Sequence, residues 1–184
     1  MPLITRRRML AAGGTLAAGL IARKPQAAVV LGDLASHLEL TDPPVTPPDI
    51  VVVGADGSEH HLAEFVGHGM VINLWATWCV PCVAEMPALA ALSKTLAPND
   101  IAVLPLSSDR GGVSVVEAFY AEHGITGLPV LLDPKGAAAR AWQAHGIPTS
   151  LIIDRKGQER ARLEGSADWS TPAAAETIRT LVAG

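Results

Sequence analysis

The chain has 184 residues, of which 49% are hydrophobic and 4% aromatic, and its formal net charge is −4. This length predicts one folded domain with additional segments, and the apolar fraction is sufficient for a hydrophobic core. Residues 1–27 hold five of the fourteen Lys and Arg and none of the eighteen Asp and Glu. The remainder is therefore formally −9 and has no basic stripe, which argues against nucleic-acid binding.

Residues 1–27 have the organisation of an export signal or an N-terminal membrane anchor. Three arginines, Arg6–Arg8, precede an apolar stretch at 9–22 that is short for a membrane span. The arginines and their neighbours are similar to the twin-arginine consensus, so we expect export to the periplasm by that route. Ordinary secretory export and an uncleaved anchor are the alternatives. Residues 28–48 contain four prolines and are predicted to be an extended linker before the folded domain, 49–184.

The folded part alternates between strand and helix patterns. Apolar or alternating runs bounded by turn residues predict strands, and apolar residues recurring at three- and four-residue steps predict helices. The predicted strands are 50–53, 59–62, 70–75, 101–106, 129–132, 149–153 and 158–164, and the predicted helices are 81–96, 113–123, 137–144 and 172–182. This order predicts an α/β sandwich of three layers: a central mixed sheet with helices on both faces, an N-terminal hairpin and an inserted strand–helix unit.

The two cysteines of the chain, Cys79 and Cys82, form a CxxC motif between a predicted buried strand and a predicted helix. The first sulfur then lies at the helix N-terminus, where unpaired backbone N–H groups and the helix dipole stabilise a thiolate. The second sulfur lies one turn further on, close enough to form a disulfide or to resolve a mixed one. The motif therefore predicts thiol–disulfide exchange.

Two other interpretations of the cysteines were weighed. A zinc site normally needs four ligands, and the sequence has no second CxxC and no HxxxH pattern. A purely structural disulfide would close a very short loop, to which the chain-entropy model attributes little stabilisation. We therefore expect no metal, and no cofactor other than a redox-active disulfide.

Two motifs resemble the active-site signatures of the thioredoxin fold. The first is Trp-Ala-Thr-Trp-Cys-Val-Pro-Cys at 75–82, followed by Pro87, and the second is His-Gly-Ile-Pro-Thr at 145–149. The early hairpin, the insertion at 128–144 and a glutamate three residues after the second cysteine are similar to the TlpA/ResA/CcmG-like extracytoplasmic thiol–disulfide oxidoreductases. The resemblance covers 49–184.

The resemblance implies a role for each residue of the site. Cys79 would attack a client disulfide, and Cys82 would resolve the mixed disulfide. A cis bond before Pro148 would let the backbone of Ile147 face the cysteines and pair with an extended client segment, while a glycine after the final strand would let the client approach. The residues expected to contact the client are Trp78, Val80, Pro81, Ile147, Pro148 and Gly165.

Glu85 is the candidate acid or base of the site. It lies one turn beyond Cys82 on the same predicted helix, and the resemblance implies that it tunes the cysteine pair. Asn73 stands where cytosolic thioredoxins bury an aspartate, which makes Glu85 a stronger candidate. The alternatives are a solvated helix glutamate and an Asn73 that only forms hydrogen bonds within the core.

The sequence favours a reductase over an oxidant. The residues between the cysteines, Val80 and Pro81, place no cationic side chain beside the thiolate. We expect a monomer that reduces disulfides in exported clients, such as apocytochrome c or copper-site assembly factors, and that a membrane thiol–disulfide donor re-reduces. The alternatives are an oxidant or isomerase of the same fold, a thiol peroxidase, for which the Pro-x-x-x-Thr/Ser pattern is missing, and a copper chaperone.

Overall fold

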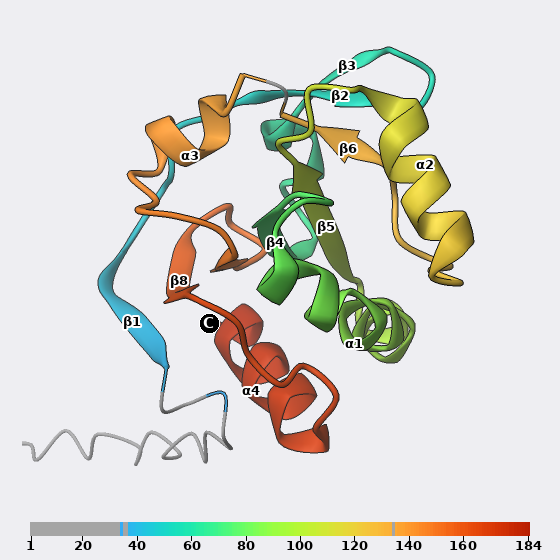
Figure 1. The fold of residues 1–184 in the computed structure, drawn as a ribbon. Coiled ribbons are helices and arrows are strands. Elements are labelled where there is room, and N and C mark those ends of the chain that lie inside the picture. The colour runs from blue at the N-terminus through green and yellow to red at the C-terminus, as the bar shows by residue number, and fades with distance from the viewer. Residues whose placement is uncertain (1–33, 35–36, 134) are drawn as a thin grey trace, which may run out of the picture.

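The computed structural model describes Leu34 and residues 37–184 with the exception of residue 134 (Figure 1). The predicted export signal at 1–27 lies outside the described residues. Within the described part, no helix combines the length and the apolar character needed to cross a membrane.

The described residues form a single mixed sheet with helices around it. The strands are β1 Leu38–Val45, β2 Val51–Gly54, β3 Glu59–His61, β4 Gly69–Trp75, β5 Ile101–Ser107, β6 Leu131–Leu132, β7 Thr149–Ile153 and β8 Glu159–Glu164. The helices are α1 Val80–Leu96, α2 Val113–Glu122, α3 Ala137–Ala141 and α4 Pro172–Ala183, with the short 3₁₀ helices η2 Leu62–Phe65 and η3 Ala97–Asn99. The strand order is β1-β8-β7-β4-β5-β6-β2-β3.

The centre of the sheet has parallel and antiparallel neighbours. β4 pairs in parallel with β5, β5 pairs in parallel with β6, and β7 is antiparallel to β4 on its other side. All seven residues of β4 are buried, as expected for a strand covered on both faces. Parallel strands end at the same edge of a sheet, so the loops that follow β4, β5 and β6 lie near one another.

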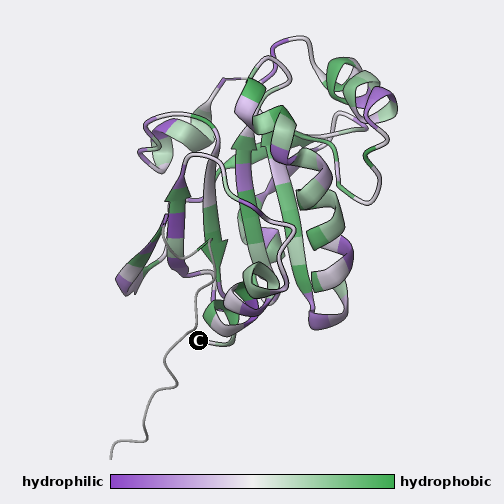
Figure 2. Ribbon diagram, turned by 60° about the horizontal axis from the view of Figure 1, so that its bottom comes forward, coloured by the Kyte–Doolittle hydropathy of each residue, from purple (hydrophilic) through white to green (hydrophobic). Residues whose placement is uncertain are grey.

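Two hydrophobic clusters cover the two faces of this sheet. Because side chains alternate along a strand, Val71 and Trp75 of β4 pack with α1, α2 and α4, whereas Ile72 and Leu74 pack with α3 and η2. Figure 2 shows hydrophobic residues concentrated along the central strands. The predicted three-layer α/β sandwich is confirmed.

The predicted linker at 28–48 is wrong for its second half. Residues 38–45 form β1, which pairs antiparallel with β8 at the edge of the sheet, with a register irregularity between Leu40 and Val45. Thr41 Oγ1 also donates a hydrogen bond to Glu159 Oε1 of β8, at 3.0 Å. An edge strand tolerates prolines because only one side of its backbone must pair, so the proline content did not exclude a strand here.

Candidate active site

The cysteines form a disulfide at the point where β4 gives way to α1. Cys79 is the N-cap residue of α1, and its Sγ accepts a hydrogen bond from Cys82 N at 3.3 Å. Pro81, in the first turn of the helix, costs no backbone hydrogen bond because N–H groups there have no partner within the helix. The first sulfur is thus held among the free N–H groups of a helix N-terminus, as the motif predicted.

The two sulfurs differ in accessibility. Cys79 is 6% exposed and Cys82 is fully buried. The side chains around Cys79 are open to solvent: Trp78 is 67% exposed and Val80 is 80% exposed, and Pro81 is exposed as well. An incoming disulfide can therefore reach the first sulfur across an apolar surface, while the second sulfur faces the interior.

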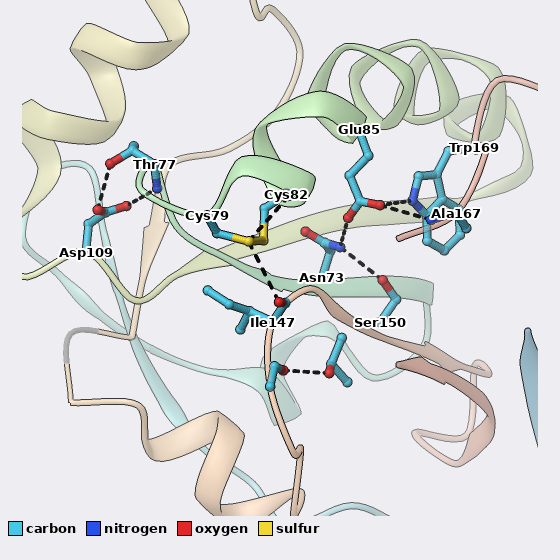
Figure 3. The surroundings of a disulfide bond; sticks show 12 residues. Asn73, Thr77, Cys79, Cys82, Glu85, Asp109, Ile147, Ser150, Ala167 and Trp169 are labelled. Atoms are coloured by element: carbon cyan, nitrogen blue, oxygen red, sulfur yellow. Dashed lines mark hydrogen bonds between the residues drawn. A yellow bond between two sulfur atoms is a disulfide. The ribbon is translucent and has the colours of Figure 1, made fainter. Parts of the chain in front are cut away.

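The second motif lies against the disulfide. The Ile147–Pro148 peptide bond is cis, and the carbonyl oxygen of Ile147 lies 3.7 Å from Cys79 Sγ (Figure 3). Pro148 itself is buried, so Ile147, which is half-buried, is the accessible part of this turn. Gly165 N donates to the carbonyl of Pro148 at 2.9 Å, and Gly165 is exposed with φ of 97°, a conformation that favours glycine.

Glu85 is buried beneath the disulfide and accepts three hydrogen bonds. Asn73 Nδ2 donates to Glu85 Oε1 at 2.9 Å, and Trp169 Nε1 and Ala167 N donate to Glu85 Oε2 at 3.1 and 3.2 Å. Asn73 Nδ2 also donates to Ser150 Oγ at 3.0 Å. With 5% of its surface exposed, Glu85 is not a solvated helix glutamate, so that alternative is wrong, and the core hydrogen bonding considered for Asn73 is confirmed.

The environment of Glu85 perturbs its protonation. Burial raises the pKa of the Glu85 carboxyl above its ordinary value of 4.5, because the charged form loses its hydration, while the three hydrogen bonds oppose the shift. One polar atom of this hydrogen-bond network is unsatisfied: Asn73 Oδ1 is buried and accepts no hydrogen bond from a described residue. Figure 3 shows Asn73 between the Glu85 carboxylate and the disulfide.

A second buried carboxylate, Asp109, lies beside the disulfide and was not predicted from the sequence. Asp109 Oδ2 accepts hydrogen bonds from Thr77 N at 2.9 Å and Ser107 Oγ at 2.7 Å, and Asp109 Oδ1 accepts one from Thr77 Oγ1 at 2.8 Å. Thr77 lies two residues before Cys79, so Asp109 holds the loop that presents the nucleophile. A polar run directly after the buried strand β5, at the carboxyl edge of the sheet, was the signal available in the sequence.

The groups gathered at this site are those of a reactive disulfide. Among the residues that the structure describes, no three His, Cys, Asp or Glu side chains gather in a way that could hold a metal ion. What the site contains is an accessible sulfur, a buried sulfur and a buried carboxyl group with a raised pKa. These are the groups that dithiol–disulfide exchange uses.

Comparisons with known proteins agree with this chemistry. The family model described as AhpC/TSA matches residues 44–161. The thiol–disulfide oxidoreductase ResA of Geobacillus kaustophilus is 31% identical over 121 residues, which cover 66% of this chain and 68% of that protein. The chain belongs to this family of thioredoxin-like thiol–disulfide oxidoreductases.

Solved structures extend the similarity to the fold. A thiol:disulfide interchange protein of the thioredoxin family from Chlorobium tepidum is 26% identical, covers 77% of this chain and 97% of its own, and superposes with a TM-score of 0.61. A second protein of that organism, assigned as the interchange protein DsbE, covers 76% and 96% with a TM-score of 0.67 at 24% identity, which shows the shared fold. The predicted resemblance to the TlpA/ResA/CcmG-like group is confirmed.

Proposed function

We propose that this thiol–disulfide oxidoreductase reduces disulfides in client proteins outside the cytoplasm, with Cys79 as the nucleophile and Cys82 as the resolving thiol. The observation that supports this assignment is the difference in burial between the two sulfurs. Cys79, at the helix N-terminus beside Ile147, keeps 6% of its surface exposed next to the exposed Trp78 and Val80, whereas Cys82 is completely buried. A client sulfur can therefore bond to Cys79, and only an intramolecular attack can involve Cys82.

The exchange has two steps. In the reduced enzyme, the Cys79 thiolate attacks one sulfur of the client disulfide, and the other client sulfur leaves as a thiolate that takes up a proton. Cys82 then loses its proton and attacks Cys79 Sγ, which releases the first client sulfur as a second thiol and leaves the Cys79–Cys82 disulfide. Two electrons pass from the enzyme dithiol to the client, and a membrane dithiol donor would restore the reduced enzyme by the reverse exchange.

Ile147, Pro148 and Gly165 would guide the client segment. The cis bond turns the backbone of Ile147 toward the disulfide, and an extended client segment can pair with it in the manner of an added strand. Gly165, exposed beside the Pro148 carbonyl, leaves room for the client backbone because it has no side chain. Trp78 and Val80 supply apolar surface around the nucleophile.

Glu85 would control the protonation states of Cys79 and Cys82. A carboxyl group with a raised pKa can change charge nearer to neutral pH than an ordinary glutamate does. When ionised, it disfavours a second negative charge on the nearby sulfurs, and it can receive the proton that Cys82 releases. The role assigned to Glu85 is therefore to tune the thiols, and Asn73, which donates to Glu85, lies between it and the disulfide (Figure 3).

The direction of exchange is tested by a redox titration. No cationic side chain stands between the cysteines, so nothing there over-stabilises the reduced thiolate. We expect a reduction potential near that of thioredoxin, about −270 mV, and a value near −120 mV would instead support an oxidant. Insulin reduction and peroxide consumption, measured on the same preparation, distinguish the reductase from a thiol peroxidase.

The client is tested by trapping. In Cys82→Ser the resolving thiol is absent, so the mixed disulfide at Cys79 should accumulate in periplasmic extract, with apocytochrome c and copper-site assembly factors as the expected clients. Cys79→Ser is the matched control, since it keeps one thiol but buries it. Equal trapping by both variants, or none by Cys82→Ser, would contradict the assignment of the two sulfurs.

A further inference from the structure

Three loops meet beside the disulfide at the carboxyl edge of the sheet. They follow the parallel strands β4, β5 and β6, and they contribute Trp78, Arg110 and Lys135 to the lining of one open hollow of about 840 Å³. Trp78 immediately precedes the nucleophile Cys79, so the hollow begins next to the position of a bound client cysteine. Crevices at this edge of α/β sheets commonly bind ligands.

The two cations of this hollow are free of partners. Arg110 and Lys135 are exposed, and neither side chain forms an ion pair or a hydrogen bond with a described residue. The other arginines of the described part donate to carboxylates or to carbonyl oxygens, as Arg160 does to Asp154 and Arg162 does to Glu159. Lys156 is the third Arg or Lys side chain of the described part that forms neither an ion pair nor a hydrogen bond, and it lines a different pocket together with Gly157.

The acidic residue in the hollow forms no ion pair with these cations. Asp109 also contributes to the lining, but its two oxygens accept hydrogen bonds from Thr77 and Ser107, and it forms no ion pair with Arg110 or Lys135. Two positive charges and the single negative charge of Asp109 therefore line one space, which is net positive in a chain whose residues 28–184 are formally −9. An anion placed between the two cations would relieve their mutual repulsion.

We propose that this hollow, which we call the Arg110–Lys135 site, binds an acidic side chain of the client close in sequence to the client cysteine that reacts with Cys79. This inference rests on the proposed function. The Arg110 guanidinium matches a carboxylate in geometry and can donate two parallel hydrogen bonds to it, with Lys135 adding a second positive charge. The exposed indole of Trp78 offers an apolar surface to the methylene groups of the same client residue.

The site would select clients mainly through charge. A predominantly acidic surface repels acidic polypeptides. The positively charged Arg110–Lys135 site next to the nucleophile would attract an acidic client segment and so favour its approach to Cys79. An extended segment advances about 3.3–3.6 Å per residue, so an acidic residue within a few positions of the client cysteine is the one that could reach the hollow. Clients with lysine at those positions should react more slowly.

The experiment uses the full chain, reduced with dithiothreitol and freed of it, and three disulfide-linked peptide dimers. The peptides are identical except for Glu, Gln or Lys at a position two residues from the cysteine, and a second set moves this residue to the other side of the cysteine. The measurement is the second-order rate constant for oxidation of the enzyme dithiol. We expect the wild type to prefer Glu to Gln by about two- to fivefold at low salt in one of the two sets, the size expected for solvent-exposed charge pairs.

Variants that remove positive charges show which residues cause the preference for the Glu peptide. The double variant Arg110→Gln with Lys135→Gln should lose the preference, whereas the double variant Lys156→Gln with Arg155→Gln, which removes the same charge from the distant β7–β8 turn, should keep it. The preference should also vanish near 1 M salt, where the screening length is about 3 Å. The reduction potential and the Cys79 pKa of each variant show whether the cations act on the thiolate instead of on the client.

The outcomes separate this inference from the proposed function. A preference for Glu that depends on Arg110 and Lys135 supports the Arg110–Lys135 site. Equal rates for Glu and Gln in both peptide sets, an equal loss on all three peptides in the Arg110/Lys135 variant, or the same loss in the Arg155/Lys156 variant would each overturn it while leaving the reductase intact. If the reduced wild type reduces none of the peptides and no insulin, the proposed function fails and the inference fails with it.

Discussion

Two buried carboxylates flank the disulfide, and they are similar in their hydrogen bonding but different in their surroundings (Figure 3). Asp109 accepts three hydrogen bonds from the ends of β4 and β5, and Glu85 accepts three from Asn73, Trp169 and Ala167. Two of the hydrogen bonds to Asp109 come from Thr77, in the loop that carries the nucleophile, and the third comes from Ser107 at the end of β5. The donors to Glu85 surround a carboxyl group whose pKa burial has raised. The number of hydrogen bonds therefore does not distinguish the carboxylate that fixes a loop from the carboxyl group with the raised pKa.

The largest effect should come from removing the loop anchor. Asp109→Ala leaves Thr77 N–H, the Thr77 hydroxyl and the Ser107 hydroxyl without their acceptor, and we expect a loss of about 2–4 kcal/mol in the free energy of unfolding. The exchange rate should fall by a similar factor at every pH, because the loop before Cys79 loosens. Urea unfolding and a pH–rate profile measure both effects, and Asp109→Asn, which retains one acceptor oxygen, should lose less.

An Asp109→Ala profile that changed shape would break the comparison. It would mean that Asp109 acts on the thiols themselves and not only through the loop that it holds. Unchanged stability would show that the hydrogen bonds to Thr77 and Ser107 contribute nothing net to the fold.

Glu85→Gln should change the chemistry more than the fold. Gln has the same shape, and the Asn73 amide can turn over to offer its Oδ1, which now accepts no hydrogen bond from a described residue. Exchange near neutral pH should slow by about 100-fold, the lower end of what a positioned acid or base contributes, and the inflection due to Glu85 should disappear from the pH–rate profile. An unaltered profile would refute the role assigned to Glu85.

The raised pKa of Glu85 also predicts how the free energy of unfolding depends on pH. Because burial raises the pKa of Glu85 in the folded state, the folded protein holds this proton more tightly than the unfolded chain does. The stability linked to Glu85 is therefore fully present below its ordinary pKa of 4.5 and is lost as the pH rises through the folded value. Each unit of difference between the two pKa values corresponds to about 1.4 kcal/mol. Urea unfolding of the oxidised protein across pH should show this decline, and Glu85→Gln should lack it.

The smallest effect tests one donor to Glu85. Trp169→Phe removes the indole N–H that stabilises the charged carboxylate, so the pKa of Glu85 should rise further and its inflection in the pH–rate profile should move to higher pH. The loss in stability should be about 1 kcal/mol. Trp142→Phe is the matched control, since its buried indole donates to the Pro48 carbonyl away from the cysteines. An equal shift in both variants would assign the effect to packing.

Local patterns were sufficient for the elements that carry the disulfide. The apolar run of β4 and the CxxC placed Cys79 at the start of α1, and the predicted strand at 149–153 coincides with β7. Strand β6 is shorter than predicted, Leu131–Leu132, and α3 ends at Ala141 instead of residue 144. Edge strand β1 was missed because its pairing with β8 is long-range, and a proline-rich segment gives no local signal for it.

The sequence by itself determined the chemistry: two cysteines at a strand–helix junction and a glutamate one helical turn later, all within seven consecutive positions, 79–85. These features are local, so periodicity and capping rules are enough to locate them. Only the tertiary structure decided that Glu85 is buried against Trp169, that Asp109 holds Thr77, and that Arg110 and Lys135 line one hollow with Trp78. Those contacts join segments far apart in the chain, and the burial that raises the pKa of Glu85 exists only once the segments have packed together.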